Sequence, residues 1–140
     1  MPCLEISLPK VSIQTKERLA AALTEAFCSA TSHPSEIFGI RYLEYEMGQA
    51  AVGGKLVSDE ITTPYIHFLL YCPRLRRNQK QKLASSLSQA FVSVVENKSW
   101  MPTIHICEHP YDNVVVGGQL LSDAYEECAK RKFYFELPQD

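Results

Sequence analysis

The sequence predicts an α/β fold built from two tandem β-α-β units. The letters VGGKLVSD, which begin at Val52, recur as VGGQLLSD at Val116, sixty-four positions later. Short apolar runs with a period of two, typical of half-buried strands, are each followed by an apolar stripe at helical spacing. A duplicated unit of about sixty residues explains these observations together.

The duplication keeps its register without a gap through both halves, as a true repeat should. KERLAAALTEAF, which begins at Lys16, faces KQKLASSLSQAF, which begins at Lys80, and Glu44 faces Glu108. A chain of 140 residues is long enough for one hydrophobic core and too short for two. The predicted organisation is a single domain over 1–140, with repeat 1 at about 2–62, repeat 2 at about 64–123 and a C-terminal tail at 124–140.

Each unit is predicted to contain a strand, a helix and a second strand. Leu4, Ile6 and Leu8 alternate with more polar neighbours, and Ser12 is the predicted N-cap of the first helix. The apolar stripe of that helix consists of Leu19, Ala22, Leu23, Ala26, Phe27 and Ala30. The predicted strands cover 3–8, 38–45, 65–72 and 103–108, and a Gly-Gly turn follows the second and the fourth.

The helix of each unit connects two parallel strands through a right-handed crossover. Two such units give a four-stranded mixed sheet with both helices on one face. The other face is left open, and a sheet made largely of Ile, Leu, Phe and Tyr that is buried on one side only normally finds its second cover in another subunit. We therefore expect a symmetric oligomer.

Composition and charge exclude several classes of protein. The formal net charge of −2 gives no reason to expect binding to nucleic acid. No segment suits a membrane span, and the N-terminus lacks the order of a signal peptide. The five cysteines form no CxxC pair, so neither a disulfide framework nor a zinc site is expected. We expect a cytoplasmic protein without a metal or cofactor.

Two stretches resemble known proteins. Pro2 follows Met1 at the start of the first predicted strand, and LTEAFCSATSHPSEIFGIRYLEYEMGQAAVGG, which begins at Leu23, resembles macrophage migration inhibitory factor and aligns without gaps on cis-chloroacrylic acid dehalogenase. The second copy, with NQKQKL and its glycine pair, resembles 4-oxalocrotonate tautomerase. Over about residues 2–123 the chain is thus similar to the tautomerase superfamily. The resemblance implies two fused units that assemble as a homotrimer.

Pro2 is the candidate catalytic residue. Removal of Met1 frees a secondary amine that takes a proton beside a carbonyl and returns it elsewhere. An ordinary α-amino group titrates near ~7.7 to 8.0, so a base that works near pH 7 needs apolar walls and nearby cations to lower its pKa. While Met1 is attached, the nitrogen lies in an amide and cannot act as a base. The alternative is that Pro2 merely permits methionine removal.

The resemblance also implies cations that hold an anionic substrate and stabilise an enolate. CPRLRR places Arg74, Arg76 and Arg77 before the second helix, where the helix dipole disfavours positive charge. Their position is similar to the arginine-bearing loop of the superfamily, beside helix amides that favour anions. Arg74 and Arg76 are the preferred candidates, and a solvated basic surface is the alternative.

Three further residues are substrate-binding candidates under the resemblance. His33 occupies the position of the active-site lysine of migration inhibitory factor. Arg41 and His105 occupy equivalent positions in the two copies, each after an isoleucine that should point toward the helices, so both should project toward subunit contacts. His105 would lie near the substrate carbonyl, and the alternative is a histidine that fills an interface.

The resulting hypothesis is a keto-enol tautomerase that acts on a small 2-keto or enol carboxylic acid. A phenylpyruvate-type substrate fits Tyr42, Tyr45 and Tyr111, although these residues equally suit a core or an interface. Phe27 and Val116 stand where the dehalogenase has a histidine and a glutamate, which disfavours hydrolytic dehalogenation.

Two other classes remain open. One is a non-enzymatic signalling or scaffold protein that has kept the fold. The other is a decarboxylase or hydratase of the same superfamily, which needs a carboxylate such as that of Asp112 near the proline.

Overall fold

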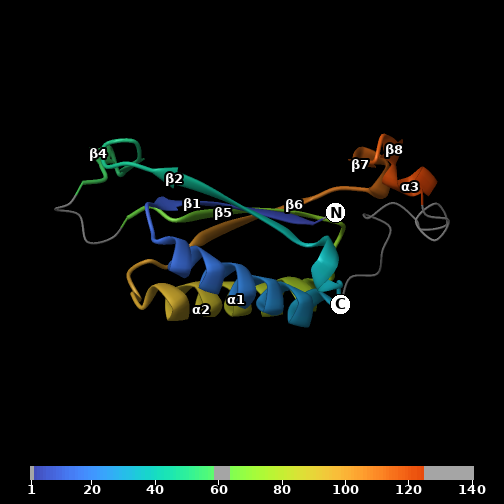
Figure 1. Ribbon diagram of the computed structural model, residues 1–140, viewed down its shortest axis with the longest axis horizontal. Coiled ribbons are helices and arrows are strands. Elements are labelled where there is room, and N and C mark those ends of the chain that lie inside the picture. Colours follow the sequence, from blue (N-terminus) through green and yellow to red (C-terminus); the bar gives the residue numbers. More distant parts are fainter. Residues whose placement is uncertain (1, 59–63, 125–140) are drawn as a thin grey trace.

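The computed structural model describes residues 2–58 and 64–124 and contains a four-stranded sheet with two long helices on one face (Figure 1). The sheet order is β2-β1-β5-β6. The central strands β1 and β5 are antiparallel, and each has a parallel edge strand beside it. The strands are β1 (Cys3–Pro9), β2 (Gly39–Tyr45), β5 (His67–Cys72) and β6 (Thr103–Glu108). The predicted mixed sheet is confirmed.

Two helices of equal length cover the lower face of this sheet in Figure 1: α1 (Ile13–Thr31) and α2 (Arg77–Val95). Ser12 is the N-cap of α1, as predicted, because its Oγ accepts a hydrogen bond from the Thr15 N–H at 3.1 Å. The second helix begins at Arg77, one of the three arginines predicted to precede it.

The duplication is visible in the elements themselves. Each bound of α2 equals the corresponding bound of α1 plus 64, and two short hairpins repeat at the same offset. The hairpins are β3 (Ala51–Val52) with β4 (Lys55–Leu56), and β7 (Val115–Val116) with β8 (Gln119–Leu120). Their Gly-Gly pairs have φ of +60° and +79° in the first and +60° and +81° in the second, a region that favours glycine.

The remaining short elements flank the second strand of each unit. They are η1 (Ser35–Ile37) before β2, η2 (Tyr111–Asn113) after β6 and α3 (Leu121–Ala124) after the second hairpin. The predicted tail beyond Ala124 lies outside the described residues. None of the helices in the described ranges is both long and apolar enough to cross a membrane.

The core lies between the sheet and the helices. Leu19, Leu23 and Phe27 of α1 are fully buried, and so are their counterparts in α2. The central strands contribute every second residue to the same cluster, with Leu4, Ile6 and Leu8 from β1. Burial of such side chains stabilises each element by about 1.5 to 3 kcal/mol per residue, so the core fixes where the ends of the strands lie.

The other face of the sheet carries no element in the described part of the chain, as predicted. Its side chains are half-buried or exposed, and Leu43 on β2 is 43% exposed. Both hairpins rise on this side, at opposite ends of the sheet (Figure 1). The face is formed by Cys3, Glu5, Ser7, Arg41, Leu43, Tyr45, His67, Leu69, Tyr71, Thr103, His105 and Cys107.

Candidate active site

Pro2 is buried at one end of the sheet, directly before β1. Its carbonyl oxygen accepts a hydrogen bond from the Gly39 N–H at 3.2 Å, which joins it to the start of β2. Since Cys3 pairs with Tyr71 in the antiparallel ladder, the last residues of β5 lie beside Pro2. The parallel strand β6 finishes at the same end, with Glu108. We call this end of the sheet the Pro2 end.

His33 lies at the Pro2 end because α1 runs back along the sheet and terminates there (Figure 1). Its ring stacks on Phe27 with centroids 5.7 Å apart and planes 9° apart. Phe27 is fully buried and also stacks on Phe38, at 4.1 Å. Phe27 therefore belongs to the core and offers no polar group to a substrate.

Arg74 and Arg76 occupy the loop between β5 and α2, also at the Pro2 end. The Arg74 side chain is 19% exposed, and its Nε lies 3.8 Å from Oε2 of Glu108. Arg76 is exposed and is the N-cap residue of α2, where its backbone N–H donates to Oε1 of Gln79 at 2.9 Å. The fold thus brings Pro2, His33 and both arginines to one end of the molecule.

Lys80 and Glu108, which were not among the predicted site residues, also lie at the Pro2 end. Lys80 lies in the first turn of α2, and its Nζ contacts Oε1 of Glu108. The Glu108 side chain is only 13% exposed. A sequence signal existed, because the same charged residues recur at the matching positions Lys16 and Glu44.

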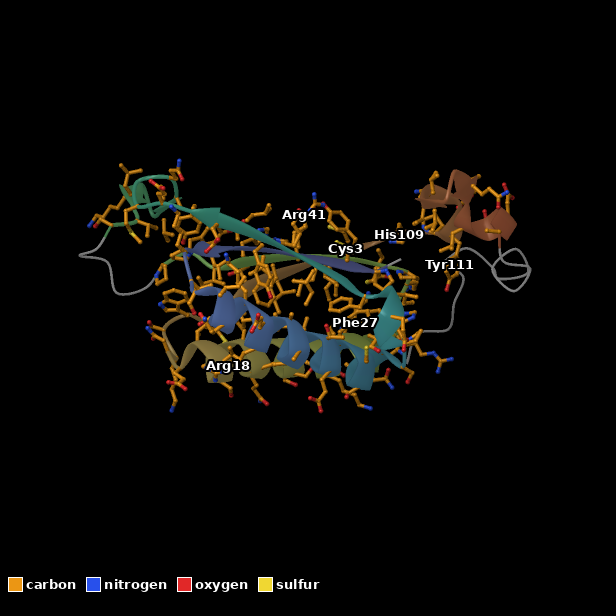
Figure 2. All side chains as sticks on the ribbon, in the orientation of Figure 1. Cys3, Arg18, Phe27, Arg41, His109 and Tyr111 are labelled. Atoms are coloured by element: carbon orange, nitrogen blue, oxygen red, sulfur yellow. The ribbon has the colours of Figure 1, made fainter. Side chains whose placement is uncertain are left out.

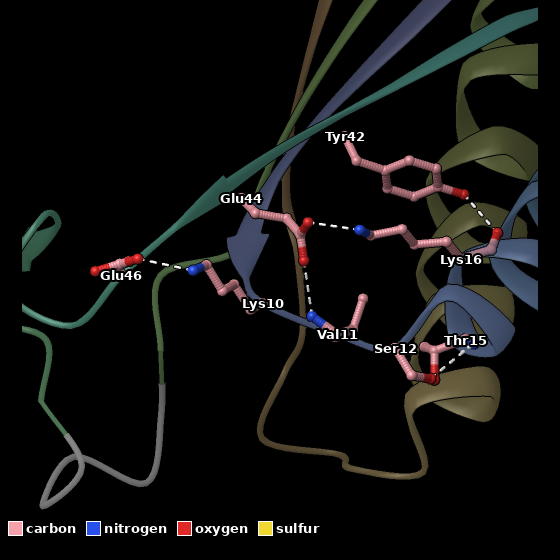
Figure 3. A network of polar contacts seen from close by, with 8 residues as sticks. All are labelled: Lys10, Val11, Ser12, Thr15, Lys16, Tyr42, Glu44 and Glu46. Atoms are coloured by element: carbon pink, nitrogen blue, oxygen red, sulfur yellow. Dashed lines mark hydrogen bonds and ion pairs between the residues drawn. The ribbon is translucent and has the colours of Figure 1, made fainter.

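The first repeat has the matching ion pair at the opposite end of the sheet (Figure 3). The Lys16 Nζ lies 2.5 Å from Oε1 of Glu44, and the Val11 N–H donates to Oε2 at 2.8 Å. These two hydrogen bonds lower the pKa of the Glu44 carboxyl. The neighbouring Lys10 pairs instead with Glu46, at 2.7 Å.

Arg41 and His105 lie on the open face, near the middle of the sheet, and the fold of one chain does not bring them to Pro2. The Arg41 Nη2 lies 2.8 Å from Oε1 of Glu5. The His105 Nδ1 lies 2.7 Å from Nε2 of His67, on the neighbouring strand. Burial, and secondly the charge of His105, lower the pKa of His67.

The three tyrosines considered for an aromatic substrate are far apart. The Tyr42 hydroxyl donates to the Lys16 carbonyl at 2.7 Å, on the helix side of the sheet. The Tyr45 hydroxyl donates to the Tyr65 carbonyl at 2.6 Å, at the end of β2 farthest from Pro2. Tyr111 in η2 is the one of the three that lies at the Pro2 end, near His109 (Figure 2).

The cysteines at the Pro2 end differ in exposure. Cys72 is buried, and desolvation raises the pKa of its thiol to about 12, whereas Cys3 and Cys107 are half-buried on the open face. Within residues 2–58 and 64–124, no three His, Cys, Asp or Glu side chains form a group that could hold a metal ion.

Solved structures share this architecture. A native fused 4-OT aligns with a TM-score of 0.79 at 23% identity, covering 86% of this chain and 97% of its own. The chain has the tautomerase-superfamily fold. At this identity the likeness shows the fold alone, and no protein-family model and no curated protein sequence matches the chain.

Two more distant structures extend the comparison within the tautomerase-superfamily fold. A member of the cis-3-chloroacrylic acid dehalogenase family aligns with a TM-score of 0.72 at 15% identity, covering 84% of this chain and 82% of its own. The macrophage migration inhibitory factor of Toxoplasma gondii aligns with a TM-score of 0.68 at 13% identity, covering 84% and 98%. Other fused 4-OT structures with TM-scores of 0.75 are asymmetric or symmetric trimers.

Proposed function

We propose that the chain is a keto-enol tautomerase in which Pro2, once Met1 has been removed, acts as general base and then general acid. The substrate is a small 2-keto or enol carboxylic acid of the phenylpyruvate type. The observation that carries the proposal is the gathering of Pro2, His33, Arg74 and Arg76 at one end of a tautomerase-superfamily fold.

Each residue has a chemical role in the proposed reaction. The Pro2 nitrogen takes the proton of the enol hydroxyl, and the resulting ammonium returns a proton to the carbon next to the carbonyl. The guanidinium of Arg74 or Arg76 binds the carboxylate, because charge-assisted hydrogen bonds to an anion are strong. These cations also stabilise the negative charge that develops on the enolate oxygen. His33 contributes a further polar contact at the Pro2 end.

We propose a homotrimer in which the open face of the sheet is covered by neighbouring copies. Fused 4-OT proteins of this fold form trimers, and the open face holds Arg41 and His105. In the trimer, these two residues approach the Pro2 end of a neighbouring chain, with His105 near the substrate carbonyl. The proposed setting is the cytoplasm, without a metal or cofactor.

Replacement of the proline tests the proposed base. Pro2→Ala, with Met1 removed, should slow the ketonisation of phenylenolpyruvate by about a hundredfold or more, since positioned proton transfer contributes about 10²–10⁴-fold. The rate is measured by the loss of enol absorbance, and intact mass confirms the N-terminus.

A matched control keeps the proline ring and blocks only its nitrogen. A leucine inserted between Met1 and Pro2 prevents methionine removal and leaves that nitrogen in an amide. The inserted variant should be as slow as Pro2→Ala. Turnover at the wild-type rate in either protein refutes Pro2 as the base.

The second candidate is a non-enzymatic signalling or scaffold protein. The apolar, buried Phe27 favours it, because a polar catalytic partner is missing at that position. A third class, decarboxylase or hydratase, relies on Asp112, which is exposed in η2. A screen of enol acids and 3-oxo acids, with intact mass measured in parallel, separates the three candidates. Turnover of enol acids indicates a tautomerase, and turnover of 3-oxo acids indicates the third class. No turnover of either by protein that has lost Met1 indicates a non-enzymatic protein.

A further inference from the structure

The two repeats carry the same lysine–glutamate pair but differ in the charges around it. At the end of the sheet opposite Pro2, two lysines face two carboxylates: Lys16 pairs with Glu44, and Lys10 pairs with Glu46 (Figure 3). The Val11 N–H occupies the second oxygen of Glu44. Each cation in this cluster therefore has its own carboxylate.

At the Pro2 end, Lys80 and Arg74 both lie beside the carboxylate of Glu108. Arg74 corresponds to Lys10, whereas Pro110 stands at the position that corresponds to Glu46, so this position is not acidic in the second repeat. Lys80 contacts one oxygen of Glu108, and the Arg74 Nε lies 3.8 Å from the other. That distance is longer than a hydrogen bond, so Glu108 is held more closely by Lys80 than by Arg74.

Partial burial makes this competition matter. Arg74 and Glu108 are 19% and 13% exposed, and interactions between charges are stronger in such places than in bulk water. A stronger attraction between Glu108 and the Arg74 guanidinium lowers the affinity of that guanidinium for any other anion. A second cation that pairs with Glu108 weakens the attraction between Glu108 and Arg74, and so raises the affinity of Arg74 for another anion.

We propose that Lys80 and Glu108 are positioning residues that set the anion affinity of Arg74: Glu108 competes with a bound carboxylate for the guanidinium, and Lys80 weakens that competition. The inference rests on the proposed role of Arg74 as the ligand of the substrate acid. The pair at the opposite end has the same lysine and glutamate but no arginine, so its role is to join helix to strand.

Benzoate is the probe, because it has a carboxylate and an aromatic ring but no proton that Pro2 can move. Its dissociation constant is measured by titration calorimetry on the full chain with Met1 removed. Glu108→Gln should tighten binding about tenfold, since a negative charge beside Arg74 is lost. Lys80→Gln should weaken binding by about the same factor, and the double variant should recover at least the wild-type affinity.

The first repeat supplies matched controls. Glu44→Gln and Lys16→Gln break the equivalent ion pair and should lower the melting temperature by as much as the second-repeat variants, with no change in benzoate affinity. Should Lys80→Gln fail to fold, the opposite shift expected for Glu108→Gln still decides. Any one of three results overturns the proposal: the wild type does not bind benzoate, the variants of both repeats change benzoate affinity equally, or Glu108→Gln binds benzoate more weakly than the wild type.

The outcome is separable from that of the proposed function. If the variants change benzoate affinity as expected but the protein does not ketonise phenylenolpyruvate, the proposed role of Lys80 and Glu108 stands and the tautomerase assignment is refuted. If turnover depends on Pro2 but Glu108→Gln leaves benzoate affinity unchanged, the tautomerase assignment stands and the proposed role of Lys80 and Glu108 is refuted.

Discussion

Cys72 ends β5 with its side chain in the core, directly beneath the Pro2 end. Burial, and secondly the charge of Glu108, raise the pKa of its thiol to about 12. Only the thiolate reacts with alkylating agents, so at pH 8 very few Cys72 thiols are in the reactive form. Native protein treated with iodoacetamide should remain unmodified at Cys72, as measured by peptide mass spectrometry.

The unfolded chain provides the reference for this prediction. In guanidinium chloride all five cysteines should be alkylated, because unfolding exposes every thiol to the reagent and returns the pKa of Cys72 to the ordinary range. Labelling of Cys72 in the native protein at the rate seen in denaturant would contradict its place in the core.

At the scale of single residues, sequence patterns predict positions better than partners. Ser12 was predicted as an N-cap from its type and its place before an apolar stripe, and the structure confirms it. Lys80 and Glu108 were visible as a repeated pair of charges, but spacing alone does not show that a residue of α2 and a residue of β6 meet. Tyr42 was indistinguishable from a ligand-binding tyrosine until its hydroxyl was found on the Lys16 carbonyl.

At the scale of elements, the Lys16–Glu44 pair joins the first turn of α1 to β2. Its side chains are 24% and 23% exposed, so water screens the charges only in part. Because the folded pKa of Glu44 is lowered, the pair stabilises the fold above the ordinary carboxyl pKa of about 4.3, and this contribution is lost as the pH falls through the folded value.

Glu44→Gln should therefore lower the free energy of unfolding at pH 7 by about 1.5 to 3 kcal/mol, the range for a hydrogen bond to a charged group. The deficit relative to the wild type should shrink as the pH is lowered below 4. Urea titrations across this pH range measure both effects. A deficit that stays constant with pH would show that the carboxylate charge is not responsible.

The two long helices and the four strands of the main sheet followed from local pattern, with errors only at their boundaries, whereas the short helical turns η1 and η2 were not predicted. The turn pairs Gly53–Gly54 and Gly117–Gly118 marked both hairpins because positive φ demands glycine. Strand β5 begins at His67, two residues after the predicted start, and the first turn of α2 includes Arg77. Propensity does not decide such ends, which depend on where ladder and capping hydrogen bonds stop.

At the scale of the whole molecule, the His67–His105 pair lies on the face that the proposed trimer covers. Tyr65 stacks on His67 at 5.9 Å, and Arg41 and Glu5 pair with each other on the same face. The pKa of His67 is lowered in the folded protein, so its neutral form stabilises the fold above the ordinary histidine pKa of about 6.5. This contribution is lost as the pH falls below that value.

Sedimentation velocity should find three chains of 15.8 kDa at pH 7.5 and dissociation toward smaller species at pH 5. His67→Asn should weaken the dependence of assembly on pH, because the neutral amide has no second proton to accept. His33→Gln, away from this face, should retain it. A monomer at pH 7.5 would refute the trimer.

The architecture could be predicted because duplication, alternation and turn residues all point to the same fold. The sequence could not predict which candidate residues lie beside Pro2 in the same chain and which lie on the open face. Arg74 and His33 reach the Pro2 end within one chain, whereas Arg41 and His105 do not, and that difference depends on strand order and on which face each strand presents. A linear pattern records neither the order of strands nor the neighbours supplied by another subunit.

The residue sixty-four positions after Pro2 is Ile66, which is 2% exposed and sits in the interior of the polypeptide. Its nitrogen is permanently acylated, so fusion of the two halves leaves only one of them able to present a free amine. An electrophile that captures the terminal nitrogen should accordingly saturate at a single adduct per polypeptide, and three per proposed assembly, in spite of the sixfold repetition of the underlying unit.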